Sequence, residues 1–185
     1  MRCLSCNCLS LAVVCDRCTK AFLQPKAKLK TLECGLSVVT FFRYDEIEIL
    51  LKTKYEPVGY FVFNFFANLI FKTFAKNYHS HTNNYAVPID DNPSKKGYSH
   101  TAILANALKS KNIKPIFNVI RAQNQIEYAG KTKEFRRNNP RNFCVNKKMS
   151  NIILIDDIIT TGSTLTEAYF ALNKNVDFAL TLCDA

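Results

Sequence analysis

The most informative stretch of the chain reads Ile152-Ile-Leu-Ile-Asp-Asp-Ile-Ile-Thr-Thr-Gly-Ser-Thr164. Its apolar start indicates a buried strand of a parallel sheet, and the acids and small residues that follow indicate a loop that opens a helix. Ligands of parallel sheets bind where strands end. The backbone N–H groups of Thr160–Thr164 would lie at a helix N-terminus, which attracts phosphate, and Gly162 would allow close approach to the backbone. We therefore predict a phosphate site in this loop.

The two acids of this stretch restrict the ligand further. Both carboxylates could not face a phosphate without repulsion, so we expect a ligand that also has hydroxyl groups, as a ribose 5-phosphate does. One carboxylate can accept hydrogen bonds from ribose hydroxyls, and the other can bind a Mg²⁺ that also contacts pyrophosphate oxygens. Paired acids also follow apolar strands in receiver-like and other magnesium sites, but those sites lack the small-residue loop.

We expect both acids at a solvent-facing strand end. The predicted site consists of Asp156, Asp157, Thr160, Thr161, Gly162, Ser163 and Thr164.

The rest of the chain alternates between β-branched or aromatic runs and helical patterns. We expect strands at residues 36–44, 84–89, 115–120, 151–155 and 176–182. We expect helices through 47–51, at 98–109 and 164–173, and one ending near Asn77 that packs Phe61, Phe65 and Leu69 into the core. Strands that alternate with helices form mainly parallel sheets with helices on both faces. The predicted fold class is therefore α/β, with a mainly parallel sheet flanked by helices.

Five of the eight cysteines crowd into the first 18 residues. Two Cys-x₂-Cys knuckles can direct four thiolates at one tetrahedral Zn²⁺, and four sulfur ligands close the coordination sphere, so such a zinc is structural. The predicted ligands are Cys3, Cys6, Cys15 and Cys18. Cys8 competes with Cys6, and the spacing favours Cys6. A redox pair or spare thiols are the alternatives.

Composition limits the class of protein and of partner. A hydrophobic content of 48% with 14 Phe favours a folded chain over a disordered one. The formal net charge of +10 favours phosphorylated ligands, nucleic acid or acidic membrane surfaces. The longest apolar run, 60–75, contains Asn64, Asn68 and Lys72 and is shorter than the ~20 residues of a membrane span. The N-terminus lacks a convincing signal peptide, so we expect a cytoplasmic protein.

A long stretch without sustained periodicity, 121–145, indicates a functional loop. Basic residues gather there and just beyond it, with Phe135 and Phe143 between them, a composition that suits single-stranded nucleic acid. A lid that clamps pyrophosphate and a solvated loop are the alternatives. The candidate nucleic-acid residues are Arg136, Arg137 and Arg141.

The stretch 152–164 resembles the signature of type I phosphoribosyltransferases at every position, and that family uses these positions for ribose and 5-phosphate binding. A four-cysteine module ahead of such a domain resembles the ComF family of competence proteins. Leu51-Lys-Thr-Lys-Tyr55 before Gly59, Val87-Pro88, and Lys96-Gly97-Tyr98 are similar to that family's intermediate segments. The resemblance implies a zinc-binding module at 1–25 and a phosphoribosyltransferase-like domain at 36–185. The lysine-rich composition of Lys20–Lys30 around Pro25 predicts a linker between them.

The resemblance also implies a function and partners. It implies a competence protein of natural transformation that handles incoming single-stranded DNA in the cytoplasm and meets the DNA-transport machinery at the inner membrane. Its core would bind phosphoribosyl pyrophosphate with Mg²⁺, with Lys95 or Lys96 on the pyrophosphate side, beside a structural zinc. The alternative is an active phosphoribosyltransferase that transfers phosphoribosyl to an unidentified acceptor and releases pyrophosphate. His79, His81 and His100 lack metal-ligand spacing, so we expect surface or capping roles for them.

Overall fold

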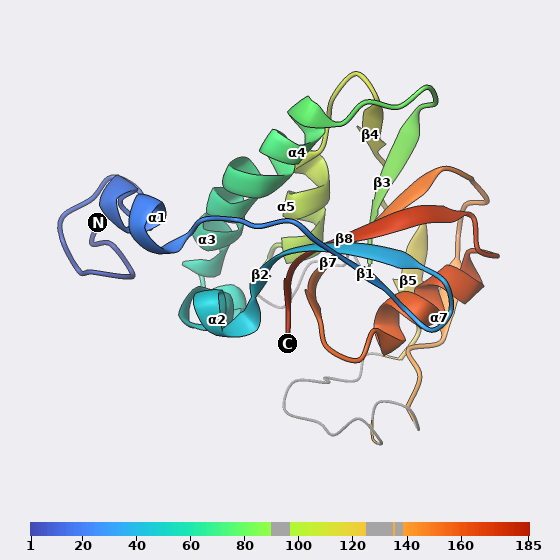
Figure 1. The fold of residues 1–185 in the computed structure, drawn as a ribbon. Coiled ribbons are helices and arrows are strands. Elements are labelled where there is room, and N and C mark those ends of the chain that lie inside the picture. The colour runs from blue at the N-terminus through green and yellow to red at the C-terminus, as the bar shows by residue number, and fades with distance from the viewer. Residues whose placement is uncertain (90–96, 125–134, 136–138) are drawn as a thin grey trace.

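The computed structural model describes residues 1–89, 97–124, 135 and 139–185 (Figure 1). A six-stranded sheet forms its centre, with the strand order β1-β2-β8-β7-β3-β4. The edge strand β1 pairs antiparallel with β2, and the other pairs in this sheet are parallel. The predicted α/β class, with a mainly parallel sheet flanked by helices, is therefore confirmed.

The elements follow the predicted alternation of strands and helices. In chain order they are α1 (Asp16–Phe22), β1 (Lys28–Thr31), β2 (Ser37–Arg43), α2 (Tyr44–Lys52), a 3-10 turn (Thr53–Tyr55), α3 (Gly59–Phe66), a π-helical turn (Ala67–Phe71), α4 (Lys72–Asn77), β3 (Asn84–Pro88), α5 (His100–Ala107), β4 (Ile113–Pro115), β5 (Ile120–Ala122), β6 (Phe143–Val145), β7 (Ile152–Ile159), α7 (Ser163–Ala171) and β8 (Val176–Asp184).

The sheet has a hydrophobic core on each face. The first core lies under α2, α3, α4 and α5, and the second lies under α7 and the β5–β6 ribbon (Figure 1). Strand β7 contributes to both, because successive side chains of a strand point to opposite faces. Ile153 and Ile155 join the first core, whereas Ile152 and Leu154 join the second. This alternation decides where the acids at the end of β7 point.

Strand β7 is longer than the sequence predicted. It continues through both acids to Ile159, and Asp156 lies opposite Thr181 of β8. The expectation that both acids lie at a solvent-facing strand end is therefore wrong, since Asp157 is buried and only Asp156 is partly exposed. A long partner strand explains the extension, because β8 runs to Asp184 and supplies backbone hydrogen-bond partners.

The single strand expected at 115–120 is two separate strands. The first part ends β4 at Pro115, and Ile120 begins β5, which pairs antiparallel with β6 in a two-stranded ribbon. Between them Asn118 has a φ of 55°, a left-handed conformation that Asn tolerates better than most residues and that turns the chain away from the sheet. The ribbon also gives regular structure to both ends of the predicted 121–145 loop.

The aromatic stripe expected on the helix before Asn77 is confirmed in part, because Phe65 and Leu69 are half-buried and pack against the first core. Phe63 and Phe66 are buried in the first core, whereas Phe61 is 51% exposed. Asn64, Asn68 and Lys72 recur every fourth residue and mark the polar side of this helix, and Phe61 lies one turn before Asn64, near that side. The π-helical turn at Ala67–Phe71 shifts the period further.

The expected linker around Lys20–Lys30 contains the end of α1 and most of β1. Helix α1 and the chain before it lie beside the sheet domain, at the left of Figure 1. Strand β1 then joins the sheet through pairs such as Lys28 with Thr40. The N-terminal module is thus connected directly to the edge of the sheet.

Candidate functional site

The acids of β7 occupy opposite faces of the sheet. Asp157 points toward the helices over the first core, where its partners are Lys54 and His100. Asp156 points to the side of α7, where the charge of Arg141 acts on it. Both lie close to the carboxyl end of β7, the edge at which ligands of parallel sheets bind.

Asp157 is held by two basic side chains. Its Oδ2 lies 3.0 Å from Lys54 Nζ and 3.6 Å from His100 Nε2. Burial raises the pKa of Asp157, but the Lys54 ammonium, followed by His100, outweighs burial and holds that pKa well below its usual range. Burial lowers the pKa of Lys54, but Asp157 and Tyr55 together outweigh burial, so the pKa of Lys54 is raised. The pair is therefore charged at neutral pH.

A hydrogen bond holds the 3-10 turn that contains Lys54 against the residues just before α5, and this position lets the Lys54 side chain reach the sheet. The Tyr98 hydroxyl donates a hydrogen bond of 2.6 Å to the Lys54 carbonyl. Gly59 permits this contact, since a Cβ there would collide with the Tyr98 hydroxyl and with the Thr53 carbonyl oxygen. Lys54, Gly59 and Tyr98 all lie in segments that the sequence singled out, although it assigned Lys54 no contact.

Asp156 has a different electrostatic environment. Burial and the neighbouring Asp157 charge raise the pKa of Asp156 to about 8, and Arg141 opposes them. Glu167 of α7 positions the Arg141 backbone, because its carboxylate accepts hydrogen bonds of 3.0 Å from Arg141 N and 2.6 Å from Asn142 N. Arg141, predicted as a nucleic-acid residue, is thus half-buried beside the acid pair.

The predicted phosphate loop follows β7 directly. Gly162 has a φ of 75°, a left-handed conformation that favours glycine, and a Cβ there would also displace the Leu32 side chain, whose Cδ2 would lie 2.7 Å away. The Thr161 hydroxyl accepts a 3.3 Å hydrogen bond from Ser163 N, and Thr166 N makes a 2.8 Å bond to Gly162 O. Helix α7 begins at Ser163, so the loop ends at a helix N-terminus with its N–H donors and positive dipole end.

The four predicted zinc ligands come together. The sulfur atoms of Cys3, Cys6, Cys15 and Cys18 all lie within 4.8 Å of one another. Tetrahedral zinc with Zn–S bonds of about 2.3 Å needs sulfur atoms about 3.8 Å apart. The 3.7 Å between the sulfurs of Cys6 and Cys15 agrees with that spacing. These cysteines could bind a metal such as zinc.

Cys8 belongs to the surroundings of this cluster. Its sulfur lies 3.3 Å from Cys6 Sγ, so the competition expected from the sequence also exists in space. Burial raises the pKa of Cys3, but hydrogen bonds from the backbone N–H groups of Cys15, Cys6 and Ser5 together outweigh it, and the pKa falls to about 6; the Cys15 N lies 3.3 Å from Cys3 Sγ. A backbone donor that favours the thiolate suits a metal ligand.

Several predicted residues lie elsewhere. Lys95, Lys96, Arg136 and Arg137 lie outside the described residues. Phe143, expected to stack on nucleic acid, lies in β6, where it packs against the second core. His100, expected on the surface or at a cap, contacts Asp157 instead. That contact joins positions far apart in the sequence, and no local pattern marks it.

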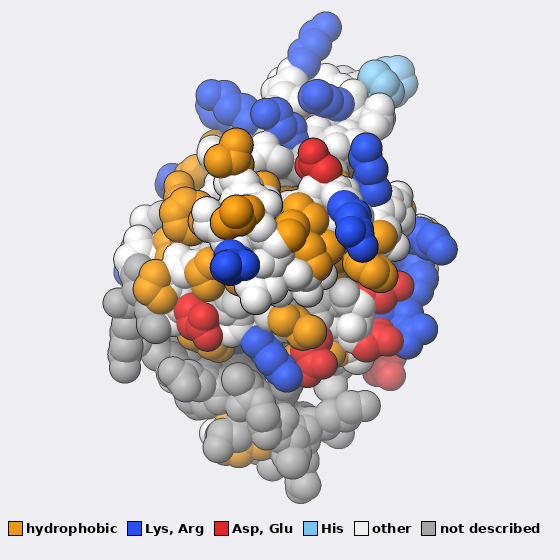
Figure 2. Space-filling model, turned by 90° about the vertical axis from the view of Figure 1, so that its left-hand side faces the viewer, with side chains coloured by type: hydrophobic (Ala, Val, Ile, Leu, Met, Phe, Trp, Pro, Cys, Tyr) orange, Lys and Arg blue, Asp and Glu red, His pale blue; other side chains and the backbone are white. Residues whose placement is uncertain are grey.

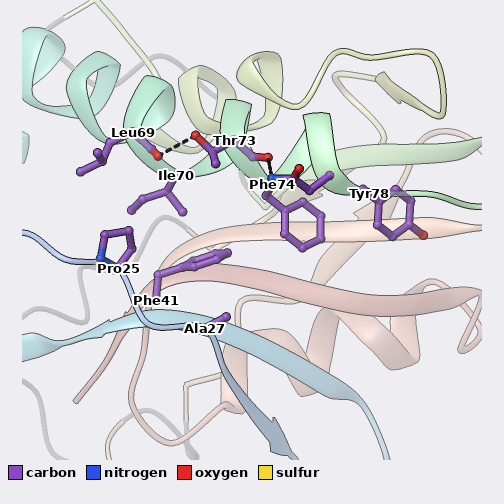
Figure 3. A pocket seen from close by; sticks show the side chains of 9 residues that line it. Pro25, Ala27, Phe41, Leu69, Ile70, Thr73, Phe74 and Tyr78 are labelled. Atoms are coloured by element: carbon purple, nitrogen blue, oxygen red, sulfur yellow. Dashed lines mark hydrogen bonds between the residues drawn. The ribbon is translucent and has the colours of Figure 1, made fainter.

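Two hollows lie away from the acid pair. The larger, of about 400 Å³, lies around Lys109, Lys111 and Lys114. The other, of about 330 Å³, is apolar and lies between α4 and the β1–β2 edge (Figure 3). Its polar groups are already bonded, since the Thr73 hydroxyl donates to Leu69 O and the Asn77 amide donates to Thr73 O. Among the described residues, neither hollow is lined by a carboxylate, so neither offers the acids predicted to hold ribose hydroxyls and Mg²⁺.

No protein-family model matches the chain, and neither does any curated protein. In the part of the chain that the structure describes, every helix is too short or too polar to cross a membrane.

Proposed function

We propose that this protein binds phosphoribosyl pyrophosphate with Mg²⁺ at the carboxyl end of β7. One observation carries the proposal: a partly exposed acid, Asp156, lies a few residues before a glycine-containing loop that ends at the N-terminus of α7. A carboxylate suits ribose hydroxyls or Mg²⁺, and a helix N-terminus suits the 5-phosphate. Phosphoribosyl pyrophosphate with Mg²⁺ offers all three binding groups: ribose hydroxyls, a metal ion and a 5-phosphate.

The two acids have unequal roles in this proposal. Asp156 contacts the ligand, because it is the acid with partial exposure and with a raised pKa that a cation would lower again. Asp157 is a positioning residue, since Lys54 and His100 already occupy its carboxylate. Thr160, Thr161, Gly162, Ser163 and Thr164 form the phosphate loop. Mg²⁺ would neutralise the pyrophosphate charge when bound.

The resemblance to ComF proteins extends this proposal to a biological role. The protein would act in natural transformation, handling incoming single-stranded DNA in the cytoplasm, near the transport machinery of the inner membrane. The net charge of +10 supports a polyanionic partner. A structural zinc on the four N-terminal cysteines would hold the module that precedes the sheet. Arg136 and Arg137 remain the proposed DNA contacts.

Calorimetry with phosphoribosyl pyrophosphate, with and without Mg²⁺, tests the proposed site. Wild type should bind, Asp156→Asn should weaken binding at least tenfold, and exposed Lys148→Met should match wild type. Equal affinity of Asp156→Asn and wild type would overturn the assignment. A pyrophosphate assay with candidate bases separates a binding protein from an active phosphoribosyltransferase, because only transfer releases pyrophosphate.

Salt dependence tests the DNA proposal. Log affinity for a thymidine oligonucleotide should fall with log salt at a slope of about −0.7 per phosphate contact. An affinity that does not change with salt would exclude binding through contacts between Lys or Arg side chains and DNA phosphates.

A further inference from the structure

Strand β1 forms one edge of the central sheet, and its outer side is uncovered. Among the described residues it pairs only with β2, and all of its side chains are exposed. Residues of an antiparallel strand alternate between those bonded to the partner strand and those whose N–H and C=O point away from it. Leu32 N bonds to Leu36 O, so the register places Lys28 and Lys30 in the bonded set. The backbone groups of Leu29 and Thr31 therefore point to the open edge.

The two faces of this edge carry different side chains. Leu29 is 72% exposed and lies opposite Val39, which packs against the first core, so Leu29 points to the face covered by α4. Lys30 lies opposite Val38 of the second core, and Lys28 points to the same side as Lys30. The edge is therefore apolar on one face and basic on the other.

The apolar hollow of about 330 Å³ continues the apolar face (Figure 3). Ala27, two residues before Leu29, lines it together with Phe41 of β2 and Phe74 of α4. The rings of Phe41 and Phe74 meet edge to face at 6.3 Å between centroids, and Phe74 stacks on Tyr78 at 5.5 Å. These contacts fix the walls of the hollow, which has room for an apolar side chain beside the open edge.

The surroundings of this edge are basic. Exposed lysines lie on both sides of the hollow, on α4 and on or beside β1: Lys26, Lys28, Lys30, Lys72 and Lys76. Within the part of the chain that the structure describes, none of them belongs to an ion pair. Lys and Arg side chains also predominate in the upper half of Figure 2, which views the side of the N-terminal module. Such a surface attracts an acidic partner.

Two other occupants fit this edge less well. A second copy that paired through its own β1 would bring the lysines of the two strands opposite or beside one another, and like charges in those positions are destabilising. Lysines on an edge strand commonly prevent such self-pairing. A nucleic acid would contact the lysines but would leave the hollow empty, since no described Lys or Arg lines the hollow.

We propose that the outer edge of β1 docks an extended segment of a partner protein in which apolar and acidic residues alternate. The segment adds a strand to the sheet through the backbone groups of Leu29 and Thr31. Its apolar side chains pack on Leu29 and enter the hollow, and its acidic side chains pair with Lys28 and Lys30. The alternation follows from the two unlike faces of the edge, because successive side chains of the added strand point to opposite faces. The inference does not depend on the proposed function.

Fluorescence anisotropy on the full chain with zinc tests the charge pattern, using a labelled peptide of about eight residues in which Val and Glu alternate. Wild type should bind this peptide and should not bind the matching Val–Lys peptide. Lys28→Glu combined with Lys30→Glu should reverse this preference, because the basic face becomes acidic. Lys109→Glu combined with Lys111→Glu is the matched control, since it changes the net charge equally at exposed lysines elsewhere and should keep the preference.

Thr31→Pro tests the strand addition, because proline removes the outward N–H of Thr31 without removing a hydrogen bond between β1 and β2. It should weaken binding of the Val–Glu peptide about tenfold, whereas Thr31→Val should bind as wild type does. If Thr31→Pro fails to fold, the charge variants decide alone.

The proposal is overturned if wild type does not bind the Val–Glu peptide, if both double variants bind it equally, or if a folded Thr31→Pro binds it as well as Thr31→Val does. Sedimentation of the chain alone and titration with a thymidine oligonucleotide examine the other occupants. A dimer that Thr31→Pro dissociates would assign the edge to a second copy. Loss of oligonucleotide binding alone in the Lys28→Glu, Lys30→Glu variant would assign the edge to nucleic acid, and either result overturns the proposal.

Discussion

Lys54 Nζ lies 3.0 Å from Asp157 Oδ2, although 103 residues separate them in the chain. Their side chains are 19% and 8% exposed, so the pair is largely removed from water. It connects the turn after α2 to the last strand before the phosphate loop. Asp157, one of the two acids predicted to bind the sugar, therefore stabilises the fold instead.

Asp157→Asn should therefore lower the free energy of unfolding. The amide keeps the shape of the side chain but leaves the Lys54 charge buried without a counter-charge, which costs about 3 kcal/mol. Urea denaturation monitored by circular dichroism measures the loss. Glu48→Gln breaks the exposed pair with Lys52 and should change stability little, so similar losses in both variants would contradict the structural role of Asp157.

Asp156 should make stability depend on pH. Its pKa is raised from 3.8 to about 8, so the native state keeps a proton that the unfolded chain releases. This contribution to stability is full below pH 3.8 and is lost as pH rises toward 8. Wild type should therefore lose stability relative to Asp156→Asn across that window, measured by urea titrations at several pH values. Parallel curves would show that the Asp156 pKa is unperturbed.

Arg141→Met should weaken binding of phosphoribosyl pyrophosphate while leaving binding of a thymidine oligonucleotide nearly unchanged. The reason is the position of Arg141, whose charge acts on Asp156 and whose backbone is held by Glu167. Lys148→Met, which removes an exposed charge, is the control. The opposite outcome, with DNA binding lost and sugar binding kept, would show that Arg141 contacts nucleic acid, as the sequence predicted.

Zinc content should follow the four-cysteine cluster. Elemental analysis should find about one zinc per chain, since four thiolates complete a tetrahedral site. Cys15→Ser should lose the metal and Cys8→Ser should keep it, because only Cys15 belongs to the set within 4.8 Å. The Cys8→Ser variant is needed because the Cys8 sulfur lies 3.3 Å from Cys6 Sγ, close enough for Cys8 to replace Cys6 as a ligand. Retention by Cys15→Ser together with loss by Cys8→Ser would replace the proposed ligand set.

Local sequence was sufficient for the features that depend on near neighbours. The apolar run before Asp156 predicted a buried strand, since a strand covered on both faces needs apolar residues at every position. A glycine just before a predicted helix suits a left-handed conformation, and Gly162 has a φ of 75°. The Cys-x₂-Cys pairs predicted a cluster because each knuckle is a short turn whose geometry depends only on its own residues.

Tertiary structure decided what depends on distant partners. Whether β7 ended before or after its acids depended on the length of β8, and whether Asp157 was a ligand or an anchor depended on Lys54. Which aromatic rings of α3 are fully buried also depended on packing, since Asn64, Asn68 and Lys72 mark a polar side in the sequence but do not fix how deeply each apolar residue lies. In each case the stabilising contact joins segments that are far apart in the sequence. The residues of one segment are compatible with more than one partner, so they do not identify the partner by themselves.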